Sequence, residues 1–547
     1  MRGPNYSQRW LLPPSVDEWV PKGHPVRFVR DFVDAVDLSK HGIAEPKGER
    51  GRPPVAADVL LTIWLYGFTQ RIRSTRQLEK ACVERLPFLW LTGNDAPDHN
   101  TIWRFFKTNS GALKGLFKTL MQSAAEANLV SFVLHALDGT KLQATSSTDG
   151  ALHRKSVEEK LKLLDEVIDQ FAKEVEATVS KQNESDGAQQ MPKEMQDVEA
   201  RRQKIRELLA QRIDDRKDGR LEEPRAAEPI PLQPAKDEPP AAAETASPPA
   251  LTSPAGPAAE STDDPLASEA KALKSELEAK LAKLDAAGEK HLSEQELDAR
   301  MMKGRAMHAL GYNAQIVVDH DSDMIVACDV SAQANDLKQL TPMLGQVQET
   351  YGRVADETTA DGGYCSGMEL ARAEEKGLPV IVRLREEPES KGGFSKAHFR
   401  YDAENNVYIC PLGEKLIQIG TNRAHPSAEP DTIYQCKNKT CPRRTDCSGD
   451  PRGRKIRRPP GEDARERQAQ KQQEPRSKIL LGLRKEIVEH LFGIIKTVDG
   501  FRRFTVCGLK KVRAQWALVC LGVNLRKLAA VATWRDGRLV PLIAAEG

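Results

Sequence analysis

The sequence predicts an α/β protein in which a mixed sheet is flanked by helices, with a helical N-terminal domain and an inserted helical or coiled-coil arm. Three observations support this prediction. Apolar residues recur at helical spacing through residues 1–128. Short apolar runs with strand character then alternate with helical patterns, which is typical of a sheet covered by helices. After the first strand, residues 150–300 are charge-rich and carry leucines at helical spacing, as an inserted arm would.

The chain has 547 residues, which is enough for about three domains. Its net charge is only +2, so a nucleic-acid partner would be recognised by local basic patches and not by the overall charge. The N-terminus has no apolar stretch of the secretory type, and the best apolar run, Trp516–Val523, is too short to cross a bilayer. We therefore expect a cytoplasmic protein without a membrane partner.

The N-terminal domain contains short helical patterns with recognisable starts. Val26–Val36 and Val55–Phe68 have helical periodicity. Ser74 can cap one further helix, and Asp98 or Asn100 can cap another. Arg104 follows shortly after the second of these caps. Short helices with basic residues near their starts fit a helix-turn-helix DNA-binding module, and a plain helical bundle is the alternative interpretation.

Residues 129–149 are interpreted as the first strand of the sheet. The largely apolar run Leu129–Leu137 predicts a buried strand that presents Asp138 at its C-terminal tip. The alternative is a turn aspartate, because Asp-Gly is a common turn dipeptide. The arm that follows contains a Pro/Ala-rich segment at about 224–265, which is expected to be disordered.

The sheet resumes in residues 301–385. Gly311–Asp319 and Met324–Val330 are two apolar runs around a short turn and predict a hairpin. A helix at Asn335–Tyr351 precedes a strand that ends at Asp361, which is followed by glycine like the first aspartate. Sheets of this kind collect their functional groups at strand ends.

A second insertion, residues 386–475, contains a cysteine cluster and the strongest local basic patch. The cluster includes a Cys-Pro-Leu-Gly turn, which is typical of zinc ligands; structural zinc and free or redox-active thiols are the two interpretations. The cysteines are Cys410, Cys436, Cys441 and Cys447. The basic patch suits phosphate contacts, although a solvated basic loop would have the same composition. Its candidate DNA-binding residues are Arg443, Arg444, Arg457 and Arg458.

Residues 476–547 are predicted to be the C-terminal helices of the sheet domain. Along the first of them apolar residues recur at three- and four-residue steps, and Lys485, Glu489 and Lys496 share the opposite face. The helix would present one carboxylate between two ammonium groups, which suits metal-assisted phosphate chemistry. An exposed glutamate with helical ion-pair partners is the alternative.

Asp138, Asp361 and Glu489 form the predicted catalytic set. Three carboxylates brought together can hold two divalent metal ions about 4 Å apart, which stabilise the attacking and leaving oxygens of a phosphoryl transfer. Magnesium suits such a site because it is a hard cation that prefers a few carboxylates together with substrate phosphate. Manganese is an acceptable substitute.

Several motifs resemble those of DDE transposases of bacterial insertion sequences. In the N-terminal part these are Gly51-Arg-Pro-Pro, Ser74-Thr-Arg-Gln-Leu-Glu and Pro97-Asp-His-Asn-Thr-Ile-Trp-Arg-Phe. In the remainder they are Leu137-Asp-Gly-Thr-Lys-Leu, Gly311-Tyr-Asn-Ala-Gln, Ala360-Asp-Gly-Gly-Tyr, Cys410-Pro-Leu-Gly and Val488-Glu-His-Leu-Phe-Gly-Ile-Ile-Lys. The resemblance implies an InsH-like N-terminal domain and an RNase H-like catalytic domain.

The resemblance also implies that the catalytic set binds magnesium in an enzyme that cuts the inverted ends of its element and joins them to target DNA. Lys496 keeps the family's spacing from the glutamate and would contact DNA phosphate. Lys485 stands where the family has arginine, and Glu486 is a lesser candidate for the third carboxylate. Double-stranded DNA would be the partner, and synapsis of two ends implies a homodimer with the arm as a candidate interface. Such a protein would work at the bacterial nucleoid.

Two alternatives come from other functional classes. One is a catalytically inactive, transposase-derived DNA-binding regulator that uses the N-terminal module and the cysteine-containing insertion. The other is a scaffold protein built on the helical arm, which would associate with itself without affinity for DNA.

Overall fold

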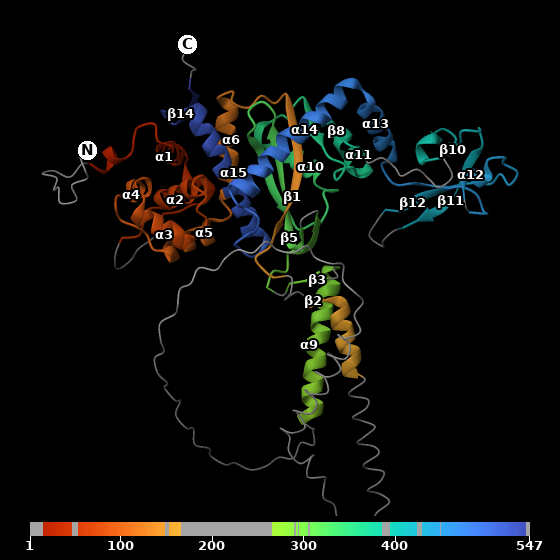
Figure 1. Ribbon diagram of the computed structural model, residues 1–547, viewed down its shortest axis with the longest axis horizontal. Coiled ribbons are helices and arrows are strands. Elements are labelled where there is room, and N and C mark those ends of the chain that lie inside the picture. Colours follow the sequence, from red (N-terminus) through yellow and green to blue (C-terminus); the bar gives the residue numbers. More distant parts are fainter. Residues whose placement is uncertain are drawn as a thin grey trace, which may run out of the picture. The chain divides into compact units, whose positions relative to one another are not determined.

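The computed structural model describes residues 15–45, 53–147, 152–165, 265–288, 291–293, 295–304, 307–384, 394–423, 429–448 and 450–542 (Figure 1). All but the end of the predicted Pro/Ala-rich segment lies outside these ranges. The chain divides into two compact units, one formed by Met1–Ala151 with His291–Gly547 and the other by Leu152–Lys290. Within the described ranges, no helix combines the length and the apolar character needed to cross a membrane.

The N-terminal part of the first unit is helical, as predicted. Its helices are α1 (Pro25–Ala35), α2 (Ala57–Thr69), α3 (Thr75–Glu84), α4 (Leu86–Thr92), α5 (His99–Asn109) and α6 (Leu113–Glu126). Asp98 caps α5 as expected, because its carboxylate accepts hydrogen bonds from the backbone N–H groups of Asn100 and Thr101. Ser74 precedes α3, but its side chain makes no capping hydrogen bond.

A six-stranded mixed sheet lies at the centre of the first unit. Its strands are β1 (Leu134–Gln143), β4 (Arg300–Gly304), β5 (Met307–Asp319), β6 (Ile325–Ser331), β7 (Glu357–Ala360) and β8 (Val380–Val382). The order is β4-β5-β1-β7-β8, and β6 pairs with β5 beyond the segment that pairs with β4. β1 is antiparallel to β5 and parallel to β7, and β7 is parallel to β8. The predicted hairpin is thus formed by β5 and β6.

The prediction that the first strand ends at Asp138 is wrong. β1 continues to Gln143, and Asp138 lies in the middle of the strand opposite Ile316 of β5. In the continuation Thr140 and Leu142 are buried and the residues between them are less so, which is the alternation of a strand with one covered face. The Asp-Gly pair is therefore part of the sheet and not a turn.

Helices flank this sheet (Figure 1). They are α10 (Leu340–Tyr351), α11 (Gly367–Glu375), α13 (Glu462–Gln473), α14 (Pro475–Gly493) and α15 (Leu509–Val531). α14 packs against β1, β7 and β8 and ends in a π-helical turn, Ile494–Val498. α15 is buried along most of its length and packs against α2, α6 and β6. The N-terminal helices and the sheet consequently share one hydrophobic core.

The cysteine-containing insertion forms a second sheet, which was not predicted from the sequence. Its antiparallel strands, in the order β13-β12-β11-β10-β9, are β9 (Arg400–Asp402), β10 (Val407–Ile409), β11 (Lys415–Asn422), β12 (Asp431–Cys436) and β13 (Lys455–Arg458). A small core of its own consists of Phe399, Tyr408, Leu416, Tyr434 and Ile456. The short helix α12 (Arg444–Cys447) lies between its last two strands.

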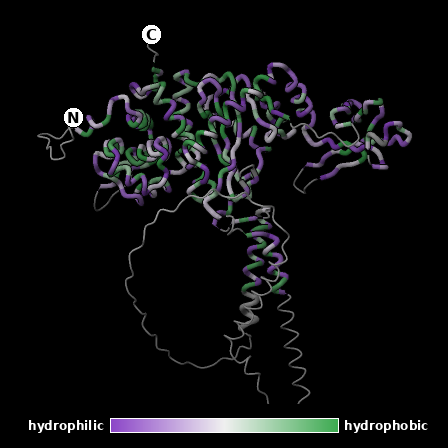
Figure 2. The backbone as a smooth tube through the Cα atoms, in the orientation of Figure 1, coloured by the Kyte–Doolittle hydropathy of each residue, from purple (hydrophilic) through white to green (hydrophobic). Residues whose placement is uncertain are grey.

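The second unit contains α9 (Pro265–Ala287) and a helical segment at residues 154–165. Arg154 pairs with Asp285, and Lys274 pairs with Asp165 at 2.6 Å. Because the partner's number falls as the residue number rises, the two segments run antiparallel. The coloured part of α9 carries both hydrophobic and hydrophilic residues (Figure 2), and its Leu277 and Leu284 are buried, as expected of a helix with one covered face. The remaining short elements are β2 (Leu152–His153), β3 (His291–Leu292), β14 (Ala532–Arg535), β15 (Arg538–Pro541) and the 3-10 turns Val16–Trp19, Leu38–His41 and Lys396–His398.

Candidate active site

Two predicted catalytic aspartates lie on neighbouring strands of the central sheet. β1 and β7 are parallel, with Leu137 opposite Ala360. The next residues, Asp138 and Asp361, are therefore neighbours across a strand spacing of about 4.8 Å. Asp138 lies inside β1, whereas Asp361 directly follows the last residue of β7, as predicted. The register thus brings together two carboxylates that are far apart in the sequence.

The surroundings of Asp138 shift the pKa of its carboxyl group. Burial raises the pKa of Asp138 to about 6; Arg484 of α14 opposes this effect and the charge of Asp361 adds to it. Nη1 of Arg484 lies 3.1 Å from Oδ2 of Asp138, and the two side chains are only 13% and 18% exposed. Oδ1 of Asp138 accepts a 2.8 Å hydrogen bond from the N–H of Gly139. Asp361 is oriented in the same way, since its Oδ1 accepts a 2.7 Å hydrogen bond from the N–H of Gly363.

Gly139 and Gly363, which follow the two aspartates, leave room for a third aspartate, Asp336, which precedes α10. A Cβ atom at Gly139 would collide with the Gln315 amide and lie 2.7 Å from Oδ1 of Asp336. A Cβ atom at Gly363 would lie 2.8 Å from Oδ1 of Asp361 and 3.1 Å from Oδ2 of Asp336. Both glycines are needed for this close approach of side chains, and Asp336 lies between the two aspartate-glycine segments.

Asp336 is held by side-chain amides from β5. Its Oδ1 accepts hydrogen bonds of 2.7 Å from both Asn313 Nδ2 and Gln315 Nε2, and Gln315 in turn accepts one from the buried hydroxyl of Tyr364. Burial raises the pKa of Tyr364, and the charges of the three aspartates add to this. Asp336, Tyr364 and Arg484 were not predicted as site residues. The available signal was the Gly-Tyr-Asn-Ala-Gln motif, which supplies both amides.

α14 runs alongside the aspartate pair. Glu489 and Lys485 are exposed, and neither forms an ion pair with a described residue. Lys496, in the π-helical turn, is half-buried; burial lowers its pKa and the charge of Asp138 opposes this. The structure thus brings the two aspartates together. Glu489 lies on the helix that packs against β1 and β7, and it forms no hydrogen bond or ion pair with a described residue.

The donor set of the aspartate pair fits a hard divalent cation. A bound cation would offset the repulsion between two neighbouring carboxylates. Among the residues described, no three His, Cys, Asp or Glu side chains enclose a metal site by themselves. Magnesium does not require such a cage, because it keeps several waters and uses one or two carboxylates together with substrate phosphate. Asp138 and Asp361 therefore fit magnesium or manganese bound together with a phosphate ligand.

Two of the predicted DNA-binding residues, Arg458 and Arg444, bind other groups of the protein. Arg458 is buried, pairs with Asp463 and Glu466, and lies 3.6 Å from the centre of the Tyr401 ring. These contacts make Arg458 a structural cation of the second sheet, so its guanidinium is not available to DNA. Arg444 donates to two backbone carbonyls of its own loop.

The other predicted basic residues lie nearer the surface. Arg457 is exposed on β13. The guanidinium of Arg443 lies 5.4 Å from the centre of the Phe394 ring. Arg104 is exposed on α5, where it lines a cavity of about 750 Å³ together with Asp98. The structure does not bring these three arginines to the aspartate pair.

The clustered cysteines line one small cavity of about 30 Å³ in the second sheet. They are Cys410, Cys436, Cys441 and Cys447, and all four are free thiols. Burial raises the pKa of Cys447; Arg454 opposes this effect and the other three cysteines add to it. The second sheet therefore gathers four thiols that are spread along the sequence.

Comparison with known protein families identifies two parts of the chain. Residues 14–108, which include α1 to most of α5, match the family model described as "Transposase domain (DUF772)". Residues 409–529, which include α14 with Glu489, match the model described as "Transposase DDE domain". No curated protein and no solved structure gave a significant match. The two family matches agree with the resemblance found in the sequence: residues 14–108 and 409–529 are similar to two transposase domains.

Proposed function

We propose that the protein cuts DNA at the inverted ends of an insertion sequence and transfers the freed strands to new DNA. The observation that carries this proposal is the register of β1 and β7, which makes Asp138 and Asp361 neighbours. The two family matches support transposition as the context. The sheet supports an RNase H-like catalytic domain, because the antiparallel strands β6, β5 and β1 are followed by the parallel strands β7 and β8.

In this proposal each site residue has a distinct task. Asp138 and Asp361, with Glu489 as the third carboxylate, hold magnesium, which stabilises the attacking and leaving oxygens of the phosphoryl transfer when bound. Water in the cutting step, and a DNA 3′-hydroxyl in the joining step, is the nucleophile. Lys496 offers its ammonium group to a phosphate beside the aspartates. Arg484 keeps Asp138 ionised and oriented through their 3.1 Å ion pair.

Other parts of the chain bind and assemble in this proposal. The helical domain 1–128 with Arg104, and the insertion 386–475 with Arg443 and Arg457, contact double-stranded DNA at the element ends and the target. Lys485 extends this surface along α14. The arm, of which the structure describes the helical segment 154–165 and α9, would join two protomers as a coiled coil when two ends are paired. The transposase acts in the bacterial cytoplasm at the nucleoid.

Structural zinc completes the proposal. Four thiols line one cavity, and zinc would draw them together as the ligands of a closed tetrahedral site. Bound zinc would fix the loops between the short strands of the second sheet, whose core of five residues is small. The loop between β12 and β13 carries several basic residues, among them Arg443, so zinc would position them for DNA.

Plasmid cleavage tests the proposed activity. Supercoiled DNA with the element's own ends would be incubated with magnesium or manganese and with wild type, Asp361→Asn or Asp356→Asn. Asp356 is a matched control because it is exposed and directly precedes the same strand, just as Asp361 directly follows it. We expect wild type and Asp356→Asn to cut the plasmid, and Asp361→Asn to bind the ends without cutting.

Two results would change the assignment. If Asp361→Asn cut as fast as wild type, Asp361 would not belong to the catalytic centre. If wild type bound the ends but cut with neither metal, the protein would be a DNA-binding regulator.

A further inference from the structure

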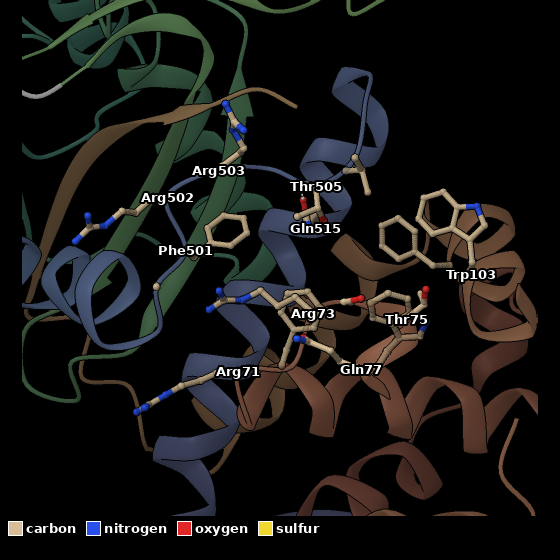
Figure 3. Close-up of a pocket in the computed structure, with 16 residues that line it drawn as sticks. Arg71, Arg73, Thr75, Gln77, Trp103, Phe501, Arg502, Arg503, Thr505 and Gln515 are labelled. Carbon is tan, nitrogen blue, oxygen red and sulfur yellow. Dashed lines mark hydrogen bonds between the residues drawn. The ribbon is translucent and has the colours of Figure 1, made fainter. Parts of the chain in front are cut away.

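A cavity of about 580 Å³ lies between the N-terminal helices and the segment that follows the π-helical turn (Figure 3). It is lined by the connection between α2 and α3, by one face of α5 and by residues 500–506. Neither the aspartates of the candidate active site nor Glu489 belongs to its lining. The cavity is therefore a separate feature of the first unit.

Four arginines line this cavity: Arg71, Arg73, Arg502 and Arg503. Asp499, the carboxylate that precedes residues 500–506, is already shared, because its Oδ1 lies 3.1 Å from Arg71 and its Oδ2 lies 2.6 Å from Arg526. Among the described residues, no carboxylate forms an ion pair with Arg73, Arg502 or Arg503. The lining thus carries an excess of positive charge that the protein does not neutralise.

Arg73 has a donor without an acceptor. Its Nη2 donates a 2.6 Å hydrogen bond to the backbone carbonyl of Asp499, but its Nε is buried and has no hydrogen-bond partner among the described residues. The guanidinium lies 5.1 Å from the centre of the Phe501 ring. A buried guanidinium donor without an acceptor is costly unless an anionic ligand supplies one.

The rest of the lining suits a nucleotide. Ser74 and Thr75 form the start of α3, and since the Ser74 side chain makes no capping bond, the first-turn N–H groups add positive potential. Figure 3 shows Phe501 beside the arginines and Trp103 at the opposite end of the cavity. Trp103 is half-buried and offers an aromatic surface on which a sugar or base can lie.

The cavity is connected to the catalytic sheet through β1. Phe504 N–H donates to the Gln143 carbonyl at 2.9 Å, and Gln143 N–H donates to the Arg502 carbonyl at 3.2 Å. Gln143 is five residues from Asp138 in the same strand, which corresponds to about 17 Å. At about 3.4 Å of rise per base pair, this length spans about five base pairs of DNA.

We propose that this arginine-lined cavity binds the sugar-phosphate backbone of the DNA substrate about five base pairs from the bond that is cut. The arginines contact phosphate oxygens, and Trp103 covers the adjoining sugar or base. This inference rests on the proposed function, because it requires DNA as the substrate. The contacts are to the backbone, so the cavity contributes affinity and register but no sequence preference.

Salt-dependent DNA binding tests the cavity. Fluorescence anisotropy would measure binding of a short labelled duplex of arbitrary sequence by wild type and by the double variant Arg502→Gln/Arg503→Gln over a series of salt concentrations. Both arginines are exposed, and within the described ranges Arg502 alone makes a side-chain hydrogen bond, to the Lys496 carbonyl at 3.1 Å. The matched control is Arg535→Gln/Arg538→Gln, which removes two exposed arginines that face each other across β14 and β15.

We expect the slope of log K against log salt to become shallower by about 1.8 in the cavity variant, or about 0.9 for each lost phosphate contact. Each single variant should show about half of this change, and the control should keep the wild-type slope. Equal slopes for the cavity variant and wild type would overturn the cavity assignment alone. Failure of wild type to bind any duplex would overturn the proposed function together with the inference.

Discussion

Arg484 of α14 forms an ion pair with Asp138 of β1 at 3.1 Å, and both side chains are mostly buried. This pair ties the helix of the matched DDE domain to the central strand. It also supplies the positive charge next to Asp138 in the protein without metal. Arg484 thus stands close to the position that a divalent cation would take.

Replacing Arg484 by glutamine should make stability depend on magnesium. Without its partner the buried Asp138 carboxylate repels Asp361, so the metal-free variant should lose about 1–3 kcal/mol of unfolding free energy. Magnesium should restore more stability to the variant than to wild type, as measured by thermal unfolding. Arg467→Gln is the control, because its pair with Glu374 is 59% and 40% exposed and should matter little. The same response to magnesium in both variants would contradict this view of Arg484.

The third carboxylate can be identified by comparing Glu489→Gln with Glu486→Gln. Both glutamates are exposed on α14 between Arg484 and Lys496, so neither replacement should disturb packing. We expect Glu489→Gln to slow metal-dependent cleavage by at least about a hundredfold, because a ligand that stabilises transition-state charge is lost. Glu486→Gln should cleave at nearly the wild-type rate. The reverse order would assign the role to Glu486.

Gly363→Ala tests the close packing behind the aspartates. The new methyl group would lie 2.8 Å from Oδ1 of Asp361, so the carboxylate has to move from its hydrogen bond with the backbone. We expect strongly reduced cleavage with little change in DNA binding. Gly345→Ala on α10 is a suitable control, since nothing lies within 4 Å of its added carbon. Full activity of Gly363→Ala would mean that Asp361 does not need its observed position.

Asp319 should be a strong contributor to stability. Burial alone raises the pKa of Asp319, but the contacts from His135 and Ser322 outweigh burial and place the pKa below its ordinary value. Its carboxylate also accepts hydrogen bonds from Ser131 Oγ and the Phe132 N–H, at 3.0 and 3.2 Å. Asp319→Asn would leave some of these buried donors unpaired and should cost about 1–3 kcal/mol at neutral pH.

The pH dependence of this effect has a definite sign. Since the pKa of Asp319 is lower in the folded than in the unfolded chain, its ionisation stabilises the fold fully above about pH 4 and less as the pH falls through the folded-state pKa. Denaturant unfolding should be measured at neutral pH and at about pH 3. The difference in unfolding free energy between wild type and Asp319→Asn should be smaller at pH 3. The exposed Asp536→Asn should match wild type at both pH values. A difference in unfolding free energy that grows in acid would contradict stabilisation by the ionised Asp319 carboxylate.

Zinc in the second sheet can be measured directly. Elemental analysis of purified protein should give about one zinc ion per chain, and Cys441→Ser should lower this value and the melting temperature. Cys507→Ser is the control, because Cys507 is an exposed thiol outside the cluster. Protein without zinc and with an unchanged melting temperature in Cys441→Ser would favour free thiols.

Local sequence patterns predicted much of the first unit. Asp98 was recognised as a helix cap because its role depends on the next three residues. The end of β1 was misplaced because an Asp-Gly pair usually indicates a turn, and only the distant Gln315 and Asp336 explain a glycine inside this strand. Arg484 was missed because its partner is contributed by another element.

The second sheet escaped prediction for a different physical reason. Its strands are short, and β11 is exposed at nearly every position, so neither length nor alternation marks it as a strand. Five side chains and four thiols fill its interior, and their partners come from separate strands. Contacts between distant residues therefore decide this part of the fold.

The central position of β1 has a consequence for synthesis of the chain. β1 leaves the ribosome well before β5, which begins at Met307, and before β7, which begins at Glu357. α2 is near the start of the chain, and its packing partner α15 is near the end, so α15 is synthesised long after α2. Folding of the first unit must therefore be largely post-translational, and nascent chains that stop before β7 should expose unpaired strand edges and rely on chaperones.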